Sequence, residues 1–175
     1  MSPEEQFAEL MSRPDTEQAR QLYERMQARI RAALSERLGL GAWETDPTTA
    51  SEAPCGDFPD VHPFNASTFG MPLWFTMGPL EPEQWQAAKQ VLRDVAGEHG
   101  FRQVVLDVDG PVSRVFQLSD GKGAAVRLMV NPQDRVVLRV DAGCHLKPEV
   151  KRLGRPLNEV EKEQYRQSRH RAGGS

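Results

Sequence analysis

Residues 112–141 read VSRVFQLSDGKGAAVRLMVNPQDRVVLRVD and decide the fold. Apolar and polar residues alternate within three runs of this stretch, and Asp-Gly and Asn-Pro turn signals separate the runs. The runs are 112–118, 123–130 and 135–141. Such short connections join only antiparallel neighbours, so we expect three consecutive antiparallel strands with one buried face.

Elements on the N-terminal side of this stretch complete the predicted core. Two further apolar runs have strand character, and three segments carry apolar residues at the three- and four-residue steps of a helix. We expect strands at 73–77 and 101–108 and helices at 3–12, 15–38 and 82–99. The predicted fold class is α+β. It is a mostly antiparallel sheet of about five strands (β-α-β-β-β-β) packed on one core helix and preceded by N-terminal helices.

The 175 residues divide by composition into four segments. Residues 1–40 are a helical segment that packs on the core, and 41–70 are a long loop that needs tethering, here at Cys55. Residues 71–146 form the α+β core. Residues 147–175 are a basic polar tail that is partly helical or disordered.

Charge is distributed unevenly along the chain. The formal net charge is −3, but the tail from Lys147 onward holds eight Lys or Arg against four Glu, a net of +4 that leaves −7 on the rest. The glutamates are interspersed with the basic residues, which weakens the case for a polyanion-binding arm. We therefore expect no nucleic-acid partner.

The N-terminus, Met1 to Glu5, offers neither the basic nor the apolar region of a signal peptide. No apolar run approaches the roughly 20 residues needed to cross a bilayer. These features predict a cytosolic chain, or a chain from which a leader has been removed.

The two cysteines, Cys55 and Cys144, allow several interpretations. As a disulfide they close a loop of about ninety residues, worth about 4–5 kcal/mol by chain entropy, and they indicate an oxidising compartment. As reduced thiols they indicate a cytosolic protein. A zinc site with His62 and His145, or a Cys144 nucleophile beside His145, is disfavoured because neighbouring side chains of an extended segment point to opposite faces. The residues favour the disulfide slightly over reduced thiols, and no cofactor or metal is predicted.

Other candidate residues have both a functional and a structural interpretation. Asp107 and Asp109 suggest an acidic site, but Asp before Gly-Pro is ordinary turn chemistry. Trp74 belongs to a set of aromatic residues that either line a pocket or build the core, and their predicted buried faces favour the core. The set is Trp74, Phe75, Trp85, Phe101 and Phe116. With His62 and His145, the residues Trp74, Asp107 and Asp109 form the candidate ligand or partner surface; no catalytic residue is predicted.

Several motifs of the chain resemble those of one protein family. The most specific are Cys-Gly-Asp-Phe-Pro at 55–59 and Gly-Cys-His-Leu at 143–146, and a weaker likeness extends from Glu4 to Leu146. The chain resembles the LppA-like lipoprotein family of mycobacteria and related actinobacteria. This resemblance implies an exported, lipid-anchored envelope protein with no established activity, and it favours the disulfide interpretation. The basic tail departs from the family.

The leading functional hypothesis is a non-enzymatic, exported cell-envelope domain that acts as a binding or interaction module. Its partner is an unknown envelope protein or a small ligand, and the resemblance implies membrane association through a removed N-terminal lipid anchor. One alternative is a cytosolic enzyme or accessory protein in which Cys144 or His145 reacts. Another is an immunity-type inhibitor whose acidic body covers a basic partner.

Overall fold

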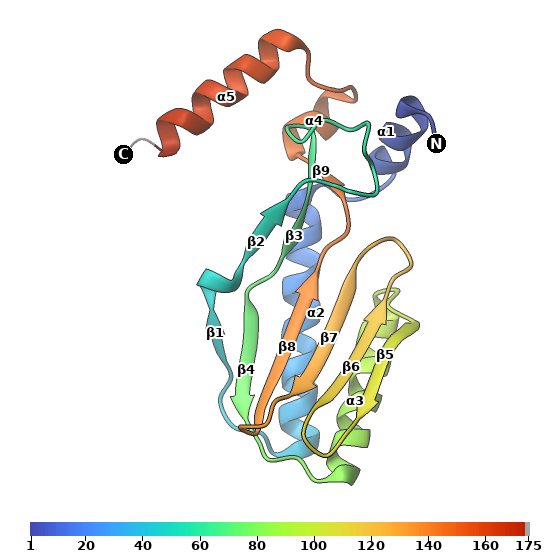
Figure 1. Cartoon of the computed structure of the whole chain (residues 1–175), viewed down its shortest axis with the longest axis vertical. Helices are drawn as coiled ribbons and strands as arrows, with labels where there is room; N and C mark the ends of the chain where they lie inside the picture. The colour runs from blue at the N-terminus through green and yellow to red at the C-terminus, as the bar shows by residue number, and fades with distance from the viewer. Residues whose placement is uncertain (174–175) are drawn as a thin grey trace. The chain divides into compact units, whose positions relative to one another are not determined.

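The computed structural model describes residues 1–173, which form two compact units. The sheet unit comprises residues 20–52 and 69–143 (Figure 1). The terminal unit comprises residues 1–19, 53–68 and the described residues from 144 onward. Each unit is therefore assembled from segments that lie far apart in the sequence.

Antiparallel strands build the sheet unit. Their bounds are β1 Glu44–Asp46, β4 Leu73–Met77, β5 Gln103–Asp109, β6 Arg114–Ser119, β7 Ala125–Val130 and β8 Arg135–Asp141. They are hydrogen-bonded in the order β1-β4-β8-β7-β6-β5. The strands expected at 73–77, at 101–108 and within 112–141 all form, and the α+β fold class is confirmed.

The described chain has nine strands, more than the five expected. The additional ones come mainly from residues 41–70, which hold β1, the 3-10 helix η1 Pro47–Thr49, β2 Ser51–Ala53 and β3 Ala66–Gly70. The ninth is β9 His145–Leu146. Because these strands have only two to five residues, they are too short to show a two-residue period in the sequence.

Two helices, α2 Thr16–Leu38 and α3 Pro82–Glu98, lie on the same face of the sheet (Figure 1). Pro82 in the first turn and a capping box between Glu81 and Gln84 start α3. Four of its buried residues recur at three- and four-residue steps: Trp85, Ala88, Leu92 and Ala96. The core lies between these helices and the inward residues of the strands, which include Phe116, Leu118, Val126, Leu128, Val136 and Leu138.

The terminal unit contains α1 Pro3–Met11, α4 Pro148–Leu153 and α5 Glu159–Gly173. Its β9 pairs antiparallel with β3, in the register Ala66 to Leu146 and Ser67 to His145. A separate apolar core holds the unit together: Leu10, Cys55, Phe58, Ala66, Cys144, Leu146, Val150 and Leu157. None of the described helices has both the length and the apolar character needed to cross a membrane.

Candidate functional site

Cys55 and Cys144 form a disulfide, with a Cα–Cα distance of 5.5 Å across 89 residues of sequence. Arg13 lies beside it: Arg13 Nη1 donates to the Cys144 carbonyl at 3.1 Å, and the guanidinium lies 5.1 Å from the centre of the Phe58 ring. The disulfide interpretation is therefore confirmed. With its sulfur bonded and the residue only 3% exposed, Cys144 offers no thiolate for nucleophilic chemistry.

The two candidate histidines both belong to the terminal unit. His145 is buried, and its Nδ1 donates to the Pro14 carbonyl at 2.7 Å. His62 Nδ1 accepts from the Phe64 backbone N–H at 3.0 Å, so its ring proton resides on Nε2. Burial, with Lys162 and Arg166 nearby, lowers the pKa of His62. His62 borders a pocket of about 370 Å³ together with Phe7 and other residues of this unit.

Asp107 and Asp109 project from β5 toward α3 and hold a buried cation. Lys89 Nζ lies 2.9 Å from Asp107 Oδ1 and 3.0 Å from each Asp109 carboxylate oxygen, and the Lys89 residue is only 3% exposed. Trp85 Nε1 also donates to Asp109 at 2.6 Å. Because Lys89 and Trp85 donate to it, the pKa of Asp109 is lowered to about 2. Asp107 and Asp109 therefore fasten α3 to β5, the strand at the edge of the sheet.

The pKa of Asp109 predicts a loss of stability in acid. An unfolded Asp titrates near 3.9 and the folded Asp109 near 2, so its stabilising contribution is complete above about pH 4 and disappears as the pH falls through 2. Asp109→Asn should remove this part of the pH dependence. Urea unfolding of both proteins between pH 2 and 6 measures it, with Asp94→Asn on exposed α3 surface as the control. An unchanged pH slope in Asp109→Asn would contradict the assignment.

The five candidate residues are divided between the two units. His62 and His145 lie in the terminal unit, whereas Trp74, Asp107 and Asp109 lie in the sheet unit. Trp85, Phe101 and Phe116 are core residues as expected, but Trp74 and Phe75 are only half-buried. Within residues 1–173, no group of three or more His, Cys, Asp or Glu side chains could hold a metal ion.

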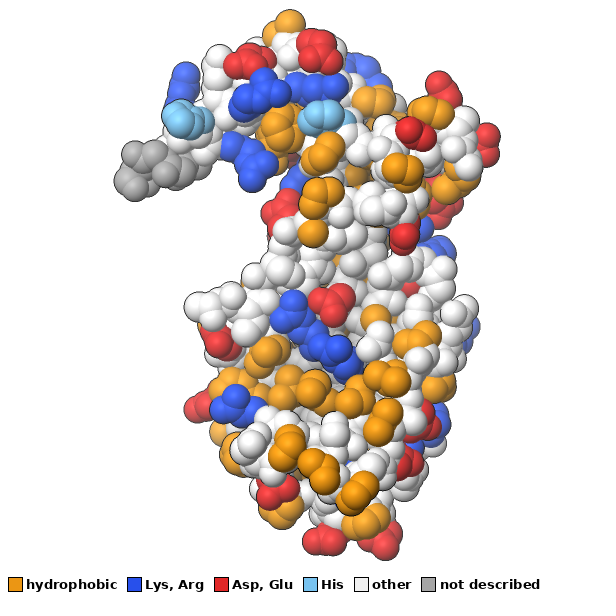
Figure 2. All heavy atoms as spheres, in the orientation of Figure 1, with side chains coloured by type: hydrophobic (Ala, Val, Ile, Leu, Met, Phe, Trp, Pro, Cys, Tyr) orange, Lys and Arg blue, Asp and Glu red, His pale blue; other side chains and the backbone are white. Residues whose placement is uncertain are grey.

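The sheet face opposite α2 and α3, the open face, carries a continuous row of apolar residues. Cross-strand register places five residues of β4, β8, β7, β6 and β5 side by side: Phe75, Val137, Met129, Val115 and Val108. Figure 2 shows apolar side chains forming a band across this face. We call these five residues the apolar row.

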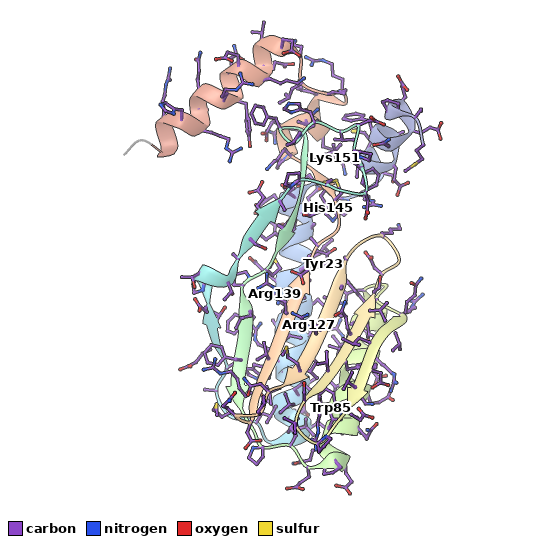
Figure 3. The ribbon with its side chains drawn as sticks, in the orientation of Figure 1. Tyr23, Trp85, Arg127, Arg139, His145 and Lys151 are labelled. Carbon is purple, nitrogen blue, oxygen red and sulfur yellow. A yellow bond between two sulfur atoms is a disulfide. The ribbon has the colours of Figure 1, made fainter. Side chains whose placement is uncertain are left out.

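An arginine pair lies next to the apolar row, one outward position further along β7 and β8. Arg127 and Arg139 are cross-strand neighbours and lie beside each other on the open face (Figure 3). Arg139 is held in place: its Nη1 donates to the Thr49 carbonyl at 2.9 Å and its Nε to Asp141 at 3.2 Å. Arg127 Nε is buried and has no hydrogen-bond partner among the described residues.

Sequence reasoning missed Lys89, Arg127 and Arg139. The two arginines occupy outward positions of the alternating pattern in β7 and β8. The alternation by itself could therefore have placed both on the face that points away from the core. Lys89 lies in a helix with no neighbouring acid in sequence, so its pairing with β5 has no local signal.

Comparisons with known proteins agree with the motifs at the two cysteines. The model of the LppA family, described as a lipoprotein confined to pathogenic Mycobacterium, matches residues 2–148. The crystal structure of a lipoprotein LppA from Mycobacterium tuberculosis matches with a TM-score of 0.72 at 16% identity, covering 87% of this chain and 91% of that one. No curated protein matches. The family match covers most of the chain, so this protein belongs to the LppA lipoprotein family.

Proposed function

We propose that this protein is a non-enzymatic binding module of the cell envelope that docks a partner protein on the open face. The observation that carries the proposal is the apolar row with the Arg127–Arg139 pair beside it, on a sheet face that neither α2 nor α3 covers (Figure 2). Interfaces combine an apolar centre with arginine in this way. Membership in a lipoprotein family supports attachment to the envelope on its extracytoplasmic side.

The arginine pair indicates an acidic partner. The chain is acidic overall, with a formal net charge of −3, yet this face presents two adjacent guanidinium groups. Like charges on neighbouring strands repel. Asp141 pairs with Arg139, and a carboxylate from a partner that pairs with the Arg127 guanidinium relieves the remaining repulsion. This charge distribution favours an acidic partner over the basic partner of an immunity-type inhibitor.

Site-specific photo-crosslinking tests the proposal. A photoreactive residue at Met129, in the centre of the apolar row, is expected to capture an envelope protein of Mycobacterium through a segment rich in Asp or Glu. The same residue at Gln90, on the helix-covered side, should capture none of it. Mass spectrometry of the linked peptide gives the readout.

Charge reversal supplies the control for this experiment. Arg127→Glu should weaken capture by about tenfold or more, because it places like charges against the acidic partner. Arg37→Glu, an equal charge change at the exposed end of α2, should leave capture unchanged. Failure of Met129 to capture any protein, capture of a second copy of this chain, or capture insensitive to Arg127→Glu would overturn the proposal.

A further inference from the structure

A second feature of the sheet unit, the Gln27 pocket, uses none of the residues of the open face. It has a volume of about 300 Å³, at the lower end of the range for small-molecule sites. Its wall includes Glu24, Gln27 and Arg31 of α2 on one side and Met71, Pro72 and Trp74 on the other. The three residues of α2 are spaced so that they share one face of the helix.

Gln27 is the unusual residue of this pocket. The residue is 1% exposed, and its Nε2 has no hydrogen-bond acceptor among the described residues. Buried amide donors almost always have a partner, because an unmade bond costs the full desolvation of the group. Because Gln27 lines the pocket, a turn of its amide toward the pocket would bring this donor to an acceptor atom on a bound molecule.

Arg31 and Trp74 define what kind of acceptor fits. The Arg31 guanidinium lies 3.5 Å from the centre of the Trp74 ring and makes no ion pair with a described carboxylate. Partial burial of the guanidinium lowers the pKa of Arg31. A half-buried guanidinium is stabilised by an anion, and the ring of Trp74 with Met71 and Pro72 supplies an apolar wall.

We infer that the Gln27 pocket binds a small carboxylic acid with a short apolar chain. Its carboxylate accepts from Gln27 Nε2 and pairs with Arg31, and its chain lies against Met71, Pro72 and Trp74. The exposed carboxylate of Glu24 also borders the pocket and would favour an amine. An amine of the same chain length is therefore the most informative control ligand, because its binding would contradict the preference for a carboxylate.

Titration of the full chain with hexanoate tests the inference. The Gln27 side-chain amide signal in the ¹⁵N NMR spectrum, identified by its absence in Gln27→Met, is expected to shift and to saturate at millimolar hexanoate. Hexanamide, which lacks the charge, should bind about tenfold more weakly, and hexylamine should not bind. An unmoved Gln27 signal, or hexylamine binding as tightly as hexanoate, would overturn the inference.

Two variants separate binding from folding. Gln27→Met removes the unpaired donor at similar volume, so its thermal midpoint should be unchanged or higher while hexanoate binding, followed by the Trp74 indole signal, weakens about tenfold. Arg31→Leu should abolish the preference for hexanoate over hexanamide. Gln90→Met on α3 should bind as the unmodified chain does. A midpoint several degrees lower in Gln27→Met would show that the amide is already bonded within the protein, and the inference would fail.

Discussion

Replacing both Cys55 and Cys144 by Ala is expected to lower the free energy of unfolding by about 4–5 kcal/mol. The disulfide spans 89 residues, a loop that encloses the whole of residues 69–143 of the sheet unit. Without the link, the unfolded chain regains the entropy of that loop. Native domains have total stabilities of only about 5–15 kcal/mol, so the variant should be close to unfolding at physiological temperature.

Urea unfolding with and without dithiothreitol measures this effect. The reductant should lower the urea midpoint of the unmodified chain to that of the double-Ala variant and leave the variant unchanged. A difference of less than about 1 kcal/mol between the two proteins would show that the unfolded chain is already compact, which removes the entropic basis of the prediction.

Trp85→Ala is expected to cost about 3–5 kcal/mol, the range for truncating a fully buried aromatic residue. Trp85 is 1% exposed in the first turns of α3, and its Nε1 donates to Asp109 at 2.6 Å. The substitution therefore opens a cavity between α3 and the sheet and also removes a contact that fastens the helix to β5.

Two controls divide this cost into its parts. Trp85→Phe keeps most of the apolar burial and loses the hydrogen bond, so about 1–3 kcal/mol is expected. Trp43→Ala removes a half-buried tryptophan whose Nε1 donates to Ser35, and it should cost clearly less than Trp85→Ala. Denaturant unfolding gives the three values. Equal costs for Trp85→Ala and Trp43→Ala would contradict the packing described for α3.

The strand β5 shows where periodicity misleads. Val104, Leu106 and Val108 alternate with Val105 and Asp107, a pattern typical of a strand with one buried face, but all seven residues of the strand are exposed. The strand lies at the edge of the sheet, and its register shifts between Val104 and Leu106. The side chains that turn toward α3 are Asp107 and Asp109, because Lys89 compensates their charge there. A bulge and an edge position depend on the neighbouring strands, so a local pattern cannot reveal them.

The sequence by itself determined the long helices, the antiparallel strands from 73 to 141 and the family at the two cysteine motifs. These features have local causes: a repeating apolar period, turn residues and short distinctive motifs. Tertiary structure alone decided the short strands of 41–70, the place of Lys89 between two aspartates, and the Arg127–Arg139 pair. It also decided that the Gln27 Nε2 donor has no acceptor within residues 1–173. Each of these depends on which distant segment supplies or withholds a partner, and that is settled only when the chain packs.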